Sequence, residues 1–151
     1  MTTNIATTRE QSARLLQCGV DPETADMHWH GAIVPRGGSL TSPPEPSEEW
    51  ALFNCPYGFM PEEMQKDKLM EDYNEIIPAW SLSALLNLMP RKVTHKGRTN
   101  IFGLYHEEEK DGGGWNYSCP GIVYFTEDTP FEAVIKMIEW LTANNYKLNE
   151  L

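Results

Sequence analysis

The stretch Thr129–Tyr146, TPFEAVIKMIEWLTANNY, decides the fold, because it marks the start, the buried face and the end of a helix together. Thr129 is a helix-capping residue, Pro130 suits the first helical position, and Glu132 stands where it completes a capping box. Apolar side chains then recur at helical spacing as one broad stripe: Phe131, Val134, Ile135, Ile138 and Leu141. The pattern predicts an amphipathic helix that covers the core of the domain.

The N-terminal half of the sequence predicts a helix followed by two strands. Residues 1–7 are mostly polar and indicate a disordered lead, and Thr8 with Gln11 has the spacing of a second capping box. Residues 27–34 alternate in the way that is typical of a strand. The next segment, 35–49, carries four prolines and two glycines, so it predicts a long loop before a short second strand.

The C-terminal half predicts short helices and a β-meander before the long helix. Pro61 opens a weakly amphipathic helix, and Ser81 caps a second, leucine-rich one. Residues 99–126 alternate in three strand-like runs, the first of which is 99–107. This order of elements predicts a single α+β domain over residues 1–151. A small antiparallel meander packs against the C-terminal amphipathic helix and two or three shorter helices.

Length and composition indicate a globular domain without a membrane segment. A chain of 151 residues, 40% of them hydrophobic, is long enough to bury one core. No apolar run approaches the roughly 20 residues that cross a bilayer, and the N-terminus lacks the layout of a signal peptide. Three widely spaced cysteines without a secretion signal are typical of reduced thiols. We therefore expect a cytoplasmic protein without membrane contact.

The charge of the chain is strongly negative and unevenly distributed. A net charge of −10 argues against nucleic acid as a partner. Nine acidic residues fall within 45–75, where they either form a solvated surface or imitate the phosphates of DNA for a DNA-binding partner. Four basic residues fall within 91–98 and either lie in solvent or contact a partner. A protein is the partner that this distribution favours.

Three segments occur in a characteristic order: Glu10–Met27 (EQSARLLQCGVDPETADM), Pro78–Pro90 (PAWSLSALLNLMP) and Thr129–Tyr146. They cover roughly a third of the chain. Together they resemble the hallmark segments of small hypothetical proteins that are encoded by phages and mobile elements of gut bacteria related to Bacteroides. The resemblance implies an intracellular bacterial setting and a phage or prophage origin, and it transfers no catalytic residue.

Asp26, His28 and His30 are the sharpest candidates for a chemical site. Alternate residues of a strand project from one face, so the three side chains can converge on one metal ion. Two histidines and a carboxylate are ligands that zinc favours, and a zinc-bound water would then act as a nucleophile. The alternative is structural: Asp26 belongs to a turn, and the histidines hydrogen-bond on a half-exposed face.

Three other features carry weaker functional signals. Cys55 and Cys119 both precede a proline in a turn, but the sequence places no dedicated base beside them, so structural thiols are expected. The glycines at 112–114 lack phosphate-binding spacing and indicate a hairpin tip. Trp115, which follows them, is expected to be an exposed aromatic residue.

The sequence leaves two classes of function. The first is a small acidic, non-enzymatic interaction or accessory protein of phage or mobile-element origin, which binds an unidentified protein partner. The alternative is a metal-dependent hydrolase that uses Asp26, His28 and His30 to hold zinc. The sequence contains no established catalytic or cofactor-binding motif, and this favours the first class.

Overall fold

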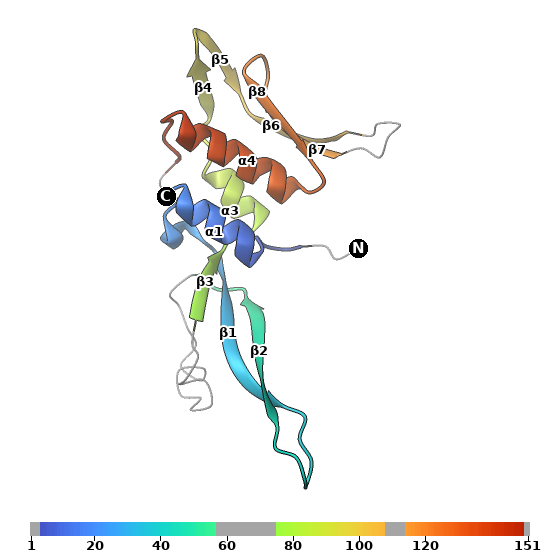
Figure 1. The fold of residues 1–151 in the computed structure, drawn as a ribbon. Helices are drawn as coiled ribbons and strands as arrows, with labels where there is room; N and C mark the ends of the chain where they lie inside the picture. Colours follow the sequence, from blue (N-terminus) through green and yellow to red (C-terminus); the bar gives the residue numbers. More distant parts are fainter. Residues whose placement is uncertain (1–3, 57–74, 108–113, 150–151) are drawn as a thin grey trace.

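The computed structural model describes residues 4–56, 75–107 and 114–149, and Figure 1 shows their arrangement. These residues form an α+β fold of helices and antiparallel strands, as the sequence predicts. The helical elements are α1 (Arg9–Gln17), the 3-10 helix η1 (Pro22–Thr24), α3 (Leu82–Asn87) and α4 (Pro130–Ala143). The strands are β1 (Met27–Arg36), β2 (Glu45–Phe53), β3 (Glu75–Ala79), β4 (Lys92–His95), β5 (Arg98–Ile101), β6 (Gly103–Glu107), β7 (Gly114–Cys119) and β8 (Val123–Glu127).

Three antiparallel sheets lie on two sides of a helical middle layer. Their strand orders are β2-β1-β3, β4-β5 and β6-β7-β8. In Figure 1, α1, α3 and α4 lie between the first sheet, whose β1–β2 hairpin extends away as a long arm, and the other two sheets. None of the helices in the described part of the chain combines the length and the apolar content that crossing a membrane requires.

Helix α4 forms the centre of the core, as its sequence predicts. All five residues of its predicted stripe are buried, and Ala133 and Met137 join them with 0% exposure. The helix packs on β7 and β8 and also contacts α1 and α3. Burial contributes about 1.5–3 kcal/mol for each large apolar side chain, so this face is a leading source of stability.

The start of α4 differs from the predicted capping box. The Thr129 hydroxyl accepts a hydrogen bond from the Glu132 N–H at 3.1 Å, as expected. The Glu132 carboxylate, however, bonds Gln11 Nε2 at 3.0 Å and the guanidinium of Arg14, which also bonds Glu139. Burial alone would raise the pKa of Glu132, but the hydrogen bonds from Arg14 and Gln11 outweigh it and lower that pKa. The Glu132 carboxylate therefore joins α1 to α4.

The N-terminal segment is ordered earlier than predicted. Thr7 is fully buried, at 0% exposure, although it belongs to the segment 1–7 that the sequence indicates as a disordered lead. The Thr7 hydroxyl accepts a hydrogen bond from the Trp80 N–H at 3.0 Å, and the Thr7 N–H donates to the Trp80 carbonyl at 2.9 Å. The Thr7 carbonyl accepts from the Trp29 indole N–H at 2.9 Å. These long-range bonds anchor the chain before α1 begins.

The β1–β2 hairpin corrects the predicted loop over residues 35–49. Both strands extend into this segment, so the connection between them shrinks to residues 37–44. Pro35 lies opposite Pro46. In an antiparallel ladder, hydrogen-bonded pairs alternate with non-hydrogen-bonded pairs, and a proline fits the second kind because no backbone N–H is needed there. Prolines at such a position are compatible with strand pairing, which is why composition alone overestimates the loop. The helix predicted from Pro61 lies outside the described residues.

The predicted strand 99–107 is divided between two sheets. Its first part is β5, which pairs with β4 across a tight turn at Lys96 and Gly97, with φ of 49° and 79°. Its second part is β6, which pairs with β7. Between them, Phe102 stacks on Tyr117 with 5.7 Å between the ring centroids. The chain therefore changes sheets at the point where Phe102 packs against the core.

Tyr146 connects the segment after α4 to the β4–β5 hairpin. Its hydroxyl donates to the Thr94 carbonyl at 2.9 Å and accepts from His95 Nδ1 at 2.7 Å. Its ring stacks on Trp140 with 5.7 Å between the ring centroids. Trp140 is partly buried, so it covers the margin of the core.

Asn149 connects the end of the described chain to α3. Its backbone N–H donates to the Leu88 carbonyl at 2.8 Å, and its side-chain Nδ2 donates to the Met89 carbonyl at 2.6 Å. The last carbonyl groups of a helix have no partner within the helix itself. Asn149 supplies hydrogen-bond donors at this end of α3.

Candidate ligand-binding groove

The structure places Asp26, the first residue of the predicted metal site, at the start of α3. Its carboxylate accepts hydrogen bonds from the Ser81 N–H at 2.8 Å and from the Ser81 hydroxyl. The Ser81 oxygen in turn accepts from the Ala84 N–H at 3.1 Å, as the capping residue of the helix. The Asp26 carboxylate therefore has a structural role, because it holds the capping residue in place.

His28 and His30 lie on the same face of β1 and are buried, at 1% and 3% exposure. The His28 Nδ1–H donates to the Cys55 carbonyl at 3.0 Å, and its ring stacks on Phe53 with 5.3 Å between the centroids. His30 packs against the same phenylalanine, at 5.9 Å between the centroids. This face of β1 is thus buried rather than half-exposed.

Within the described residues, no three His, Cys, Asp or Glu side chains are grouped so that they could hold a metal ion. Zinc binding by Asp26, His28 and His30 stays a prediction, which elemental analysis of the purified protein tests. Zinc at one per chain that is lost in His28→Ala would support the site. Zinc well below one per chain, unaffected by that substitution, would exclude it.

The buried thiol of Cys119 is unsuited to nucleophilic chemistry. Its side chain has 0% exposure and belongs to the core between the sheet and α4. Burial raises the pKa of the thiol, which keeps it protonated and weakly nucleophilic. For Cys119 the expectation of a structural thiol therefore agrees with the structure.

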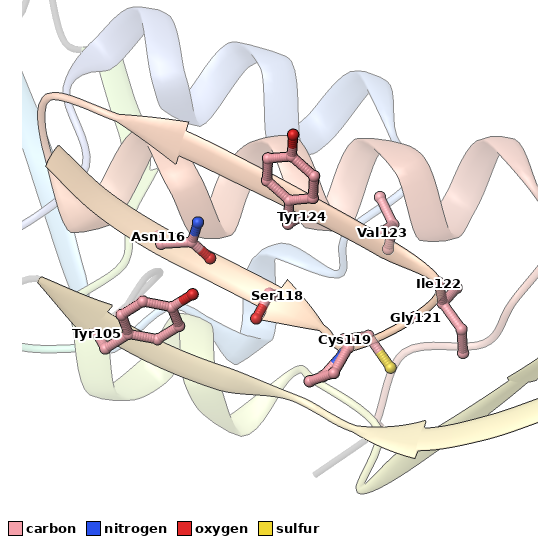
Figure 2. Close-up of a pocket in the computed structure, with 9 residues that line it drawn as sticks. Tyr105, Asn116, Ser118, Cys119, Gly121, Ile122, Val123 and Tyr124 are labelled. Atoms are coloured by element: carbon pink, nitrogen blue, oxygen red, sulfur yellow. The ribbon is translucent and has the colours of Figure 1, made fainter. Parts of the chain in front are cut away.

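The strongest candidate for a functional site is a groove on the outer face of the β6-β7-β8 sheet, which Figure 2 shows. Side chains alternate along β7, so Tyr117 and Cys119 join the core while Asn116 and Ser118 lie on the opposite face. The groove has a volume of about 540 Å³, within the range of small-molecule sites. We call it the tyrosine groove, and it is lined by Tyr105, Asn116, Ser118, Cys119, Pro120, Gly121, Ile122, Val123 and Tyr124.

Strand pairing sets the two tyrosines on opposite sides of β7. Tyr105 of β6 lies beside Asn116, and Tyr124 of β8 lies beside Ser118. Gly103 of β6 occupies the other position beside Ser118, and a Cβ atom at Gly103 would meet nothing within 4 Å. The missing side chain leaves open space next to Ser118.

Asn116 lies at the floor of the groove, and the oxygen of its side-chain amide has no hydrogen-bond partner among the described residues. The residue is only 4% exposed, and its Nδ2 donates to Thr126 Oγ1 at 3.0 Å. Its Oδ1 has no donor within hydrogen-bond distance among the described residues. Figure 2 shows this oxygen turned toward Ser118 and the middle of the groove. A buried acceptor without a partner costs about 1–3 kcal/mol, so its persistence requires an explanation.

The β7–β8 turn closes one end of the groove. Gly121 has a φ of 77°, which glycine adopts without the strain that a side chain would bring. Arg98 Nη1 donates to the Gly121 carbonyl at 3.2 Å, and Asn100 Nδ2 donates to the Pro120 carbonyl at 2.9 Å. These β5 side chains hold the turn. No charged side chain lines the groove itself among the residues that the structure describes.

Reasoning from the sequence missed the groove and predicted a different exposed aromatic residue. Trp115 is half-buried against the core, with its ring centroid 5.2 Å from that of His106. Among the tyrosine, tryptophan and phenylalanine residues that the structure describes, those with exposed rings are Tyr105 and Tyr124, at 46% and 70%. A signal is present in the strand WNYSC, where polar residues alternate with apolar ones. This alternation does not show which residues of the neighbouring strands lie beside the polar residues.

No protein-family model, no curated protein and no solved structure matches this chain significantly. The tyrosine groove is therefore interpreted from its own geometry and chemistry.

Proposed function

We propose that this chain is a non-enzymatic binding protein and that the tyrosine groove is the surface through which it interacts. The observation that carries the proposal is the Oδ1 atom of Asn116, which has no donor among the described residues. Buried polar groups in folded proteins almost always have a hydrogen-bond partner. A ligand that donates a hydrogen bond to this oxygen supplies the missing partner.

The lining of the groove favours binding over catalysis. Among its described residues there is no histidine, carboxylate, lysine or arginine, the side chains that carry most proton transfers in enzymes. The thiol of Cys119 faces the core, and burial raises its pKa, so it stays protonated. The remaining groups are hydroxyls, an amide and apolar side chains, which are suited to recognition.

The proposed setting is the reducing interior of a bacterium. The resemblance of three segments to proteins of phages and mobile elements supports an accessory role in such a cell. None of Cys18, Cys55 and Cys119 forms a disulfide bond in the described structure, which is compatible with a reducing compartment. A net charge of −10 disfavours a nucleic acid as the partner.

Site-specific photocrosslinking tests the proposal. A benzophenone amino acid replaces Tyr124, which is 70% exposed at the side of the groove, in the full chain expressed in a gut bacterium of the Bacteroides group. We expect irradiated cells to yield a covalent adduct of discrete mass. The same probe at Leu40, which is fully exposed on the β1–β2 connection, is the matched control and should yield none.

Asn116 then links the adduct to the site. Asn116→Leu keeps the branched shape of the side chain and removes the carbonyl oxygen. The adduct from position 124 should therefore be lost while the variant remains folded, as circular dichroism checks. An adduct that forms equally from position 40, or that persists in Asn116→Leu, would contradict the proposal.

A further inference from the structure

The tyrosine groove also indicates the class of its ligand, and this inference rests on the binding function proposed above. We infer that the groove holds a neutral sugar ring, with hydroxyl groups bonded to Asn116 and Ser118 and a C–H face packed against Tyr105 or Tyr124. Three features of the lining support this ligand: its charge, its hydrogen-bonding capacity and its aromatic surface.

The first feature is the neutral lining. No acidic or basic side chain belongs to it among the described residues, so a charged ligand would not find the opposite charge that compensates its loss of water. Arg98 approaches one end, but its Nη1 donates to the Gly121 carbonyl at 3.2 Å. The groove therefore suits a ligand without formal charge.

The second feature is the hydrogen-bonding capacity of the floor. Asn116 Nδ2 is bonded to Thr126 at 3.0 Å, so the part of the amide that remains is an acceptor only. Three residues of the same lining carry a hydroxyl that can both donate and accept, namely Ser118, Tyr105 and Tyr124. A ligand must bring at least one hydrogen-bond donor for Asn116 Oδ1. It matches the hydroxyls best if its own groups can both donate and accept hydrogen bonds. Sugar hydroxyls have this property, whereas a peptide group separates its single donor from its acceptor.

The third feature is the exposed aromatic surface. Tyr105 and Tyr124 are 46% and 70% exposed and come from the strands on either side of β7, as Figure 2 shows. Aromatic faces carry partial negative charge and attract weakly positive C–H groups. One face of a sugar ring presents such C–H groups, while its edge carries hydroxyls. The open space at Gly103, beside Ser118, gives room for the body of the ring.

Titration of the full chain with neutral methyl glycosides, followed by two-dimensional NMR, tests the inference. The panel contains the methyl glycosides of glucose, galactose, mannose and N-acetylglucosamine. N-methylacetamide serves as the probe for a peptide group, and inorganic phosphate serves as the probe for an anion. We expect at least one glycoside to shift the side-chain amide signal of Asn116 and the backbone signals of Ser118 and Tyr124, and phosphate to shift none of them.

Variants assign the shifts to the groove. Tyr124→Ala removes a ring and Asn116→Leu removes the acceptor, so each should weaken glycoside binding about tenfold. Tyr124→Phe keeps the ring and loses only a hydroxyl, so it should weaken binding about threefold. Leu40→Ala, on the arm at the opposite end of the molecule in Figure 1, is the control and should leave binding unchanged. Unchanged backbone signals of α4 verify that each variant is folded.

The outcomes separate this inference from the proposed function. One outcome is that no glycoside shifts the signals, even at the highest soluble concentration. If N-methylacetamide then shifts them, or if the native chain still gives a crosslink that Asn116→Leu abolishes, the ligand class is wrong and the binding function stands. A shift by phosphate, or a glycoside shift that is as strong in Tyr124→Ala and Asn116→Leu as in the native chain, also overturns the sugar ring. If every probe leaves the signals unchanged and position 124 gives no adduct, both proposals fail.

Discussion

The two faces of the β6-β7-β8 sheet differ in whether their buried polar side chains have hydrogen-bond partners. On the inner face, Tyr117 and Cys119 are buried among the apolar side chains of the core. On the outer face, Asn116 and Ser118 are nearly as buried, at 4% and 8%, but Asn116 keeps an acceptor that has no donor among the described residues. Burial alone therefore does not distinguish the structural face from the face that we propose binds a ligand. The unpaired acceptor of Asn116 does distinguish the two faces.

This difference predicts opposite responses to substitution on the two faces. A change on the inner face removes packing, so it should lower stability and affect binding only through unfolding. A change at Asn116 or Tyr124 in the groove should alter binding while stability stays the same or rises. The following experiments challenge that contrast.

The largest effect is expected in the helix that covers the inner face. Ile138 is fully buried on α4, so Ile138→Ala should lower the free energy of unfolding by about 2–5 kcal/mol through the cavity that it leaves. Chemical denaturation measures this loss. Ile101→Ala, at a residue 64% exposed on β5, is the matched control and should stay within about 0.5 kcal/mol. A loss below about 1 kcal/mol at Ile138 would show that this face of α4 is not the core.

A smaller effect is expected at the link between α1 and α4. Burial raises the pKa of Glu132, but the bonds from Arg14 and Gln11 outweigh it, so the folded-state pKa lies below the unfolded value. The resulting stability is fully present above the ordinary pKa of a glutamate and is lost as pH falls through the lowered pKa of the folded state. Denaturation at decreasing pH should show this loss, and Glu132→Gln should reduce it while costing about 1–2 kcal/mol at neutral pH.

The same pH series separates stability from recognition. No acid or base lines the tyrosine groove among the described residues, so ligand binding should stay constant for as long as the protein is folded. An identical pH dependence of stability in the native chain and in Glu132→Gln would contradict the role of this carboxylate. A binding affinity that changes within the folded range would contradict the neutral groove.

Asn116→Leu should move stability and binding in opposite directions. Removal of the unpaired Oδ1 recovers about 1–3 kcal/mol, and loss of the bond to Thr126 costs about 1 kcal/mol, so the free energy of unfolding should rise by about 1 kcal/mol. Thermal and chemical denaturation measure the rise. Thr126→Val removes only the partner of Nδ2 and should lower stability by about 1 kcal/mol. A destabilised Asn116→Leu would show that Oδ1 is paired in the folded protein.

The smallest effect on stability is expected at the rim of the groove. Tyr124 is 70% exposed, so Tyr124→Ala should change the free energy of unfolding by less than about 0.5 kcal/mol. Binding in the groove should nevertheless weaken. A large loss of stability in this variant would place Tyr124 in the structural part of the sheet and would weaken the contrast between its two faces.

Local patterns were sufficient for α1, α3 and α4. The caps at Thr8, Ser81 and Thr129 were predicted correctly because each hydroxyl accepts from an N–H only three residues away. The buried stripe of α4 was predicted correctly because its period belongs to the helix itself. Both signals lie within one or two helical turns, where the sequence alone determines which groups meet.

Contacts between distant segments could not be predicted in this way. Glu132 has the position of a capping-box residue, but its carboxylate meets Arg14, which is 118 residues away in the chain. Asp26 has the spacing of a metal ligand, but its carboxylate meets Ser81, 55 residues away. In each case the carboxylate bonds a residue that is remote in sequence. The packing of the elements determines that contact, and the local pattern does not reveal it.

The candidate groove depended on strand register. Alternation along β7 shows that Asn116 and Ser118 share a face, and the sequence contains that information. The positions of Tyr105 and Tyr124 beside them follow from pairing with β6 and β8. A shift of one residue in either pairing would turn the tyrosine to the other face. The site is therefore a product of register, which no local pattern encodes.

The bonds from Asn149 to the end of α3 have a consequence for how the protein is made. Asn149 lies 60 residues after the carbonyl that its side chain binds, and α4 lies after all the elements that it covers. A chain leaving the ribosome therefore presents the apolar sides of α1, α3 and the sheet before their cover has been synthesised. During that interval these surfaces are accessible to chaperones and proteases. This domain can therefore complete its core only after α4 and Asn149 have been synthesised.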